Sequence, residues 1–342
     1  MAVLSGEYLT MLDWAKRRDP GGGIADIVEA LSQWNPIVKD AMTIQGNLPT
    51  GHRSTIRTGL PGNTWTDLYG GILPTKSTTK QVDDTCGQLE ALSKVDVNEA
   101  ELDGNGEAAF RASEDVAFLE SMSQQVTETL FYGNVGATPK KFHGLAPRYN
   151  SYQTTDQDLS SYNCINGGGT GSDNTSIFLV TWKPKKCFLI FPKGSKAGLQ
   201  TEDMGKILTA APDGVGEFRA WVTHFIWKIG LVVQDWRYAV RVANIDVSDL
   251  THDAATGANL MRLLGTAYFR MPTEDIGNTA RQYLYCNKTV AEFLYHQAIN
   301  KSTTQVTLQE AATGGKFYPV FMGIPVKICD QILNTETAVD AA

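Results

Sequence analysis

The sequence has few of the residues from which catalytic and metal centres are usually built. Its five cysteines are scattered, odd in number and never spaced as C-x-x-C, which argues against both a disulfide framework and a zinc site. The five histidines stand apart from one another and from the cysteines, so no pair has metal-ligand spacing on one helix or hairpin. We therefore expect reduced cysteines and no bound metal.

Long hydrophobic runs and an excess of basic charge are also missing. The longest apolar runs, such as 187–191 and 229–233, are far below the ~18 residues that a membrane helix requires. The N-terminal residues show no basic-then-apolar order, so they do not read as a secretory signal. The 30 basic and 37 acidic residues give a net charge of −7, which disfavours wrapping of nucleic acid because phosphate neutralisation needs clustered Lys and Arg. We expect a protein that folds in a cytoplasm and has no membrane partner.

The catalytic motifs that the sequence suggests at first sight are incomplete. A nucleophile elbow needs a glycine two residues before the serine, whereas Gly194 directly precedes Ser195. The glycine-rich stretches 167–171 and 314–316 lack the spacing of a phosphate loop. The sequence therefore predicts no catalytic residue, no cofactor and no enzyme activity.

What the chain does contain is globular, with extended segments near its start. Its 342 residues, 42% hydrophobic and 20% charged, suggest about two domains. Helical spacing at 8–18 and 24–34, interrupted by Asp19-Pro-Gly-Gly-Gly23, predicts an arm with two short helices. From about 45 to 102 the composition turns to Thr, Gly and Pro, which predicts two strands around a long glycine-rich excursion.

The clearest helix is predicted over 107–132, where there is no Gly or Pro. Its expected apolar stripe consists of Ala112, Val116, Leu119, Val126 and Leu130, which recur at helical spacing. At 1.5 Å per residue such a helix is about 39 Å long, more than twice the ordinary length. A helix of this length is typical of a structural spine.

Strands and short helices are predicted over the rest of the chain. The sequence indicates strands at 177–182 and 187–191, and a long ribbon at 224–246 whose apolar alternation changes phase at Gln234-Asp235, so it forms two strands or one bent strand. A helix to about 269, a strand at 282–286 and a helix at 290–300 follow. The fold class is α+β.

This order of features resembles the major capsid protein of tailed bacteriophages. The phrases that carry the resemblance to a coat-protein family of short-tailed phages are TIRTGLPGNTWTDLYGGI, FYGNVGATPKKFHGLAPRY, LIFPKGSKAGLQTEDMG, WKIGLVVQDWRYAVRVANID and GIPVKICDQIL. The resemblance implies the Johnson fold, with an N-terminal arm, an E-loop, a peripheral domain that carries the spine helix, and an axial domain.

The resemblance also implies a division of the chain. The expected parts are an N-terminal arm at 1–45, the E-loop and its base at 46–102, a peripheral domain at 103–250, an axial domain at 251–318, and a return strand with the C-terminal tail at 319–342. Because the strand phrases at 177–246 precede the helices at 254–300, we expect a permuted connectivity of this architecture.

The implied function is a structural one: self-assembly into an icosahedral shell of hexamers and pentamers around double-stranded DNA. The implied partners are other copies of the chain, a separate scaffolding protein, a portal and possibly a decoration protein, in a virion assembled in the host cytoplasm. A phage decoration or tail protein, or an enzyme with an unrecognised site, are the rival hypotheses. The expected subunit-interface residues are Leu60, Trp65, Leu68, Ile72, Trp14 and Trp34.

Overall fold

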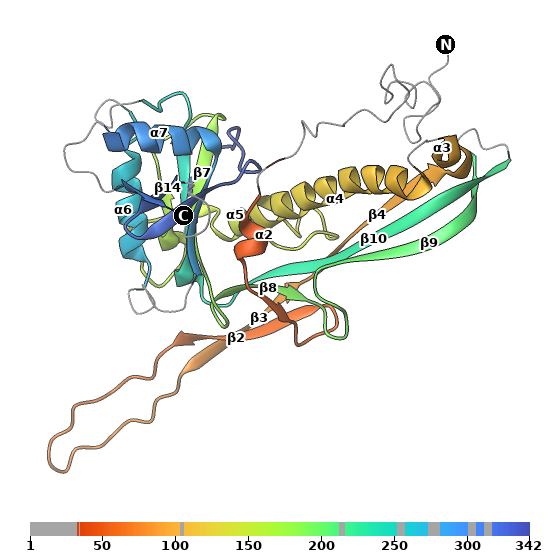
Figure 1. Cartoon of the computed structure of the whole chain (residues 1–342). Coiled ribbons are helices and arrows are strands. Elements are labelled where there is room, and N and C mark those ends of the chain that lie inside the picture. Colours follow the sequence, from red (N-terminus) through yellow and green to blue (C-terminus); the bar gives the residue numbers. More distant parts are fainter. Residues whose placement is uncertain are drawn as a thin grey trace. The chain divides into compact units, whose positions relative to one another are not determined.

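The computed structural model describes residues 33, 35–102, 106–211, 216–251, 257–272, 281–299, 306–310 and 317–342. The helices, including two short 3-10 segments, are α2 (Ile37–Asp40), α3 (Val97–Leu102), α4 (Glu107–Tyr132), α5 (Leu145–Arg148), η1 (Ser160–Asn163), η2 (Trp236–Tyr238), α6 (Leu260–Arg270) and α7 (Lys288–Ile299). The strands are β1 (Thr43–Gln45), β2 (Gly51–Gly59), β3 (Thr78–Thr85), β4 (Gly87–Asp96), β5 (Ser151–Tyr152), β6 (Cys164–Asn166), β7 (Asn174–Trp182), β8 (Cys187–Phe191), β9 (Leu199–Ala210), β10 (Glu217–Val233), β11 (Ala239–Asp246), β12 (Arg281–Cys286), β13 (Val306–Glu310), β14 (Phe317–Phe321), β15 (Ile324–Ile328) and β16 (Asp340–Ala341). Figure 1 shows them along the chain.

The chain divides into two compact units. Unit 1 contains the described residues of Gln88–Val126 and Gly198–Lys228, and unit 2 contains those of Trp34–Gly87, Thr127–Ala197 and Ile229–Ala342. This division differs from the expected boundaries, because the predicted peripheral segment 103–250 contributes to both units.

Unit 1 is a three-stranded antiparallel platform under the first part of helix α4. Strand β10 lies between β4 and β9. Phe118 of the helix stacks on Phe225 of β10, with ring centroids 6.4 Å apart. Arg111 lies over the Trp221 ring at 4.5 Å and forms an ion pair of 2.9 Å with Asp203 of β9. Helix and sheet are therefore joined by ring stacking as well as charge.

Unit 2 is built around a sheet whose central strand is buried on both faces. Strands β15, β12 and β7 are neighbours, and β11 pairs with β7. Ile177 and Leu179 pack with helices α6 and α7, while Phe178 points the other way and meets Phe131 near the end of α4, with ring centroids 5.0 Å apart. All nine residues of β7 are buried, as expected for a strand with both faces covered.

Helix α4 confirms the predicted spine, from residue 107 to residue 132, but its predicted stripe is partly wrong. Val126 and Leu130 are buried, whereas Val116 is 47% exposed. Phe110, in the first turn, and Met122 are buried instead. Phe110 packs against Val95 and Trp221 of the sheet, which the smaller side chain of Val116 does not.

The ribbon at 224–246 is two strands, as its change of phase predicts. Strand β10 ends at Val233, the 3-10 segment η2 follows, and β11 starts at Ala239. Strands and helices are also confirmed at 174–191 and 281–299, and within the predicted helix to about residue 269, with shifted ends. The predicted arm helices at 8–18 and 24–34 lie outside the described residues apart from residue 33.

The expectation of a permuted connectivity rested on placing the strands of 177–246 in one peripheral domain. Strands β7 and β11 instead form the core of unit 2 with α6 and α7, and only β9 and most of β10 belong to unit 1. Alternation alone cannot tell which sheet a strand joins, and the permuted connectivity stays a prediction.

Candidate subunit interface

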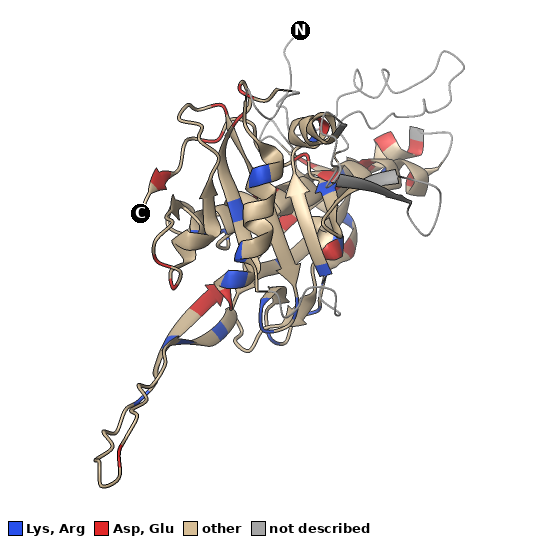
Figure 2. Cartoon of the chain, turned by 90° about the vertical axis from the view of Figure 1, so that its left-hand side faces the viewer, with Lys and Arg blue, Asp and Glu red and all other residues tan. Residues whose placement is uncertain are grey.

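A long hairpin of unit 2 projects away from its sheet (Figures 1 and 2). Strands β2 and β3 pair with each other from Gly51↔Thr85 to Gly59↔Thr78. Residues 60–77 connect them without regular structure and are called the hairpin tip below. We call the part where the hairpin meets the rest of unit 2, residues 51–54 and 82–85, the hairpin root.

The hairpin tip exposes an unusual amount of apolar side chain. Its large apolar residues are 75–106% exposed: Leu60, Trp65, Leu68, Tyr69, Ile72 and Leu73. Between Thr58 and Thr75 the only charged residue is Asp67. Water is an unfavourable environment for so continuous an apolar surface, and such surfaces mark interaction sites. The structure thus gathers the four predicted interface residues of this region in one exposed loop, together with Tyr69 and Leu73.

Two of the six predicted interface residues, Trp14 and Trp34, lie outside the described residues. Tyr69 and Leu73 were missed although they belong to the same apolar stretch. The signal that could have found them is this stretch itself, since LYGGIL places four large apolar side chains around two glycines.

The tip also holds a strained turn. The amide of Gly70 donates to the carbonyl oxygen of Asp67 at 2.9 Å, and Tyr69, inside this turn, has a φ of 71°. A bulky residue in the left-handed region is a genuine outlier, and such strain clusters at sites of function. The hydroxyl of Thr75 donates to the carbonyl oxygen of Gly62 at 2.7 Å and joins the two sides of the tip.

The hairpin root, in contrast, is held by a buried ion pair. The guanidinium of Arg148, in helix α5, donates to Asp84 Oδ1 at 2.6 Å, and their side chains are only 14% and 6% exposed. The same guanidinium nitrogen lies within hydrogen-bonding distance of the carbonyl oxygens of Leu231 (3.1 Å) and His143 (3.3 Å). Burial, and secondly the charge of Arg148, lower the pKa of His143, while Asp84 opposes this effect.

The neighbouring residue pair of the hairpin forms a similar ion pair that is exposed to water. Arg53 donates two hydrogen bonds of 2.7 Å to Asp83, and both side chains are about half exposed. The hydrogen bond from Arg53 lowers the pKa of Asp83. An exposed pair of this kind contributes little to stability.

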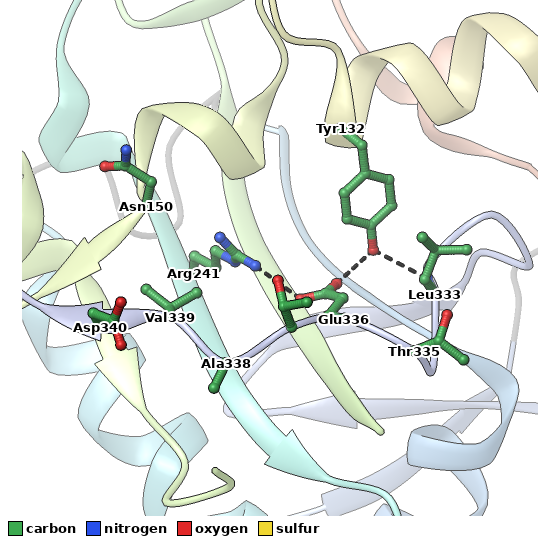
Figure 3. Close-up of a pocket in the computed structure, with 10 residues that line it drawn as sticks. Tyr132, Asn150, Arg241, Leu333, Thr335, Glu336, Ala338, Val339 and Asp340 are labelled. Carbon is green, nitrogen blue, oxygen red and sulfur yellow. Dashed lines mark hydrogen bonds and ion pairs between the residues drawn. The ribbon is translucent and has the colours of Figure 1, made fainter. Parts of the chain in front are cut away.

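Two further buried carboxylates occur in unit 2. Asp40, in helix α2, accepts hydrogen bonds from Lys327 and from the hydroxyl of Tyr285. Glu336 pairs with Arg241 at 2.8 Å and accepts a hydrogen bond from the hydroxyl of Tyr132 (Figure 3). It also accepts a hydrogen bond from the hydroxyl of Ser176. Burial and the charge of Glu336 raise the pKa of Tyr132, so this phenol stays protonated.

The Arg241–Glu336 pair lies in a cavity of about 440 Å³ between α4, β11 and the segment 333–340. Arg241 donates further hydrogen bonds to Ser176 and to the carbonyl oxygens of Ala146 and Tyr149. The charges in this cavity are thus bound by the chain itself, which marks a structural contact and not a site prepared for a ligand.

Other chemistry is sparse in the part of the chain that the structure describes. No group of three or more His, Cys, Asp or Glu side chains is placed there to hold a metal ion. Burial raises the pKa of the five free thiols, to about 11 for Cys86 and Cys164 and to about 12 for the others, so they are poor nucleophiles. No described helix is both long and apolar enough to cross a membrane.

Comparisons with known proteins agree with these features. A family model for major capsid protein GP7 matches residues 19–340. Among solved structures, that of bacteriophage Epsilon15 matches over 99% of both chains, with 35% sequence identity and a TM-score of 0.77. The capsid of bacteriophage JBD30 matches over 90% of this chain and 99% of that one, with 11% identity and a TM-score of 0.46. The capsid of a native GTA particle matches over 66% and 94%, with 7% identity and a TM-score of 0.44.

A search of curated proteins gave no match. The family match and the similarity to Epsilon15 extend over nearly the whole chain, so they include the exposed hairpin as well as both units. They confirm the resemblance to tailed-phage coat proteins and the Johnson fold. The chain belongs to the major capsid protein GP7 family and is a structural protein of the phage shell, not an enzyme.

Proposed function

We propose that copies of this chain form hexamers and pentamers that close an icosahedral shell around double-stranded DNA, and that each hairpin tip is buried against a neighbouring copy. In this reading the β2–β3 hairpin is the E-loop, α4 is the spine of the peripheral domain, residues 1–45 form the arm, and residues 251–318 with 319–342 form the axial domain and the return segment.

The observation that carries the proposal is the apolar surface of the tip. A stable protein interface usually buries on the order of 1,000 Å² or more in total, and a single buried aromatic side chain supplies ~150–250 Å². Trp65 and Tyr69 together with the four aliphatic residues of the tip therefore provide a large share of one contact. The subunit's own body covers none of these six side chains by more than a quarter, since each is at least 75% exposed.

The charge of the chain favours a shell that encloses DNA without binding it strongly. With 30 basic and 37 acidic residues, a subunit can neutralise few phosphates. DNA can then slide along the inner surface during packaging. We extend the proposal to a separate scaffolding protein, a portal and a decoration protein as partners, and to assembly in the host cytoplasm.

Electron microscopy of particles formed in host cells that also express the scaffolding protein tests the proposal. Wild-type chains are expected to give closed shells, and a chain with Trp65→Ser and Leu68→Ser is expected to remain as soluble subunits. A control is Leu159→Ser, which removes a leucine outside the hairpin that is 51% exposed. Normal shells from the tip variant would contradict the role of the tip. Loss of shells in the control alone would locate the contact elsewhere.

A further inference from the structure

We propose that Arg148 is the positioning residue of the hairpin: its ion pair with Asp84 fixes the direction in which the hairpin leaves unit 2, and hence where the tip meets a neighbour. This inference rests on the proposed role of the tip in assembly. It adds that an ion pair within one subunit determines where the tip of that subunit meets its neighbour.

The first observation is that Arg148 connects the hairpin to segments outside it. Asp84 belongs to β3, while Leu231 and His143, the other two acceptors of the guanidinium, belong to β10 and to the loop before α5. One nitrogen of the guanidinium, Nη2, lies within reach of all three acceptors, so a single cationic group ties three segments of unit 2 together at one point.

The second observation is that the other charged side chains of the root, Arg53 and Asp83, bond to each other and not to the body. His52 Nδ1, Ser54 Oγ and the second carboxylate oxygen of Asp84 are buried without a hydrogen bond among the described residues. His52 meets β8 only through its ring, edge-on to Phe188 at 5.6 Å. The side chain of Asn47, outside the hairpin, also bonds to the backbone of Arg53 at 2.7 and 2.8 Å, but this contact is exposed. The ion pair is therefore the buried polar side-chain contact that can resist a tilt of the hairpin.

The third observation is leverage. Strand β2 has nine residues, which at ~3.3 Å per residue extend about 30 Å before the tip begins, so a tilt of roughly 10° at the root moves the start of the tip by about 5 Å. Side chains must be placed far more closely than this to pack against a neighbour. A small change of hairpin direction at the root thus displaces the tip by a distance that is large for a packed contact.

The test measures hairpin direction in the unassembled full chain. Spin labels are attached at Asn63→Cys in the tip and Asp158→Cys in the body, both exposed positions of unit 2, in a Cys86→Ala background because the other four cysteines are buried. Pulsed spin-resonance distances are compared for wild type, Arg148→Met, Arg148→Lys and the double variant Asp84→Asn with Arg148→Met. The matched control is Arg53→Met, which breaks the exposed pair on the neighbouring rung.

We expect Arg148→Met and the double variant to broaden the distance distribution by about twofold or more, because the buried ion pair between hairpin and body is lost. Arg148→Lys keeps the charge as a compact ammonium and should restore the distribution in part, while Arg53→Met should leave it unchanged. The double variant leaves no unpaired buried charge, so it reports on direction if Arg148→Met alone fails to fold.

A distribution in the folded double variant as narrow as in the wild type would overturn the inference. So would equal broadening in Arg53→Met. The result is independent of assembly: if the tip variant Trp65→Ser with Leu68→Ser still forms shells, the proposed role of the tip fails, whereas the distances decide the role of Arg148 on their own.

Discussion

The root and the tip of the hairpin lie in one continuous stretch of 35 residues, from Gly51 to Thr85, yet they place their side chains in opposite ways. At the root the chain buries charge and places a cation beside it, as Arg148 and Asp84 show. At the tip the chain exposes large apolar side chains and gives them no partner of its own. The contrast supports our proposal that the root is fixed within one subunit while the tip is buried by a second one.

The strongest way to break this comparison is to remove the tip altogether. Replacing residues 60–77 by Asn-Gly, which favours a two-residue turn, should leave a short hairpin on an intact root. We expect no closed shells by electron microscopy, and a folded subunit whose thermal transition stays cooperative. Loss of that transition in the free subunit would mean that the tip belongs to the folded core.

A second way is to add one methyl group at the root and, in a separate variant, one at the tip. A Cβ on Gly51 would lie 2.0 Å from the carbonyl oxygen of Asp84, whereas a Cβ on Gly71 would meet no atom within 4 Å. Gly51→Ala should therefore lower the free energy of unfolding by about 2 kcal/mol or more, and Gly71→Ala should change it by less than ~0.5 kcal/mol. Chemical denaturation measures both, and equal effects would contradict the comparison.

A third change weakens the tip without altering the fold. Trp65→Ser should leave the melting temperature of the free subunit unchanged, because this side chain has no contact to lose there. If Trp65 anchors the contact with a neighbour, the loss is about 2 kcal/mol per contact, which raises the critical concentration for assembly by roughly 30-fold. Light scattering during assembly measures this shift, and Asn63→Ser at the same tip is the control.

The smallest expected effect is a dependence of subunit stability on pH that arises at the root and not at the tip. The pKa of His143, next to the root, is lowered by burial and by Arg148. As pH falls through the ordinary value of about 6.5, the unfolded chain takes up a proton that the folded chain resists, so subunit stability should decrease. His143→Gln should flatten this decrease in melts between about pH 7 and 5.5. The tip has no histidine, and a steeper slope in the variant would contradict this account.

Sequence patterns predicted the fold where one local rule decides the outcome. The absence of Gly and Pro over 107–132 was sufficient to predict helix α4, and the phase change at Gln234-Asp235 located the break between β10 and β11. The exposure of the tip residues could be predicted because large apolar side chains in a glycine-rich loop have few partners within their own chain. The role of Arg148 and Arg241 could not be predicted, since a charged residue in a sequence suggests solvent, and only packing shows that its partner is buried with it.

The buried pair between Arg241 and Glu336 has a consequence for the time order of folding. The three side chains that Glu336 contacts, Tyr132, Ser176 and Arg241, precede it by 204, 160 and 95 residues. Contacts so distant in sequence form slowly, and a ribosome supplies Glu336 after all its partners. Until then Arg241 lacks its carboxylate, and an unpaired buried charge costs about 3–5 kcal/mol. A chain that ends before this residue should therefore be less stable than the complete subunit.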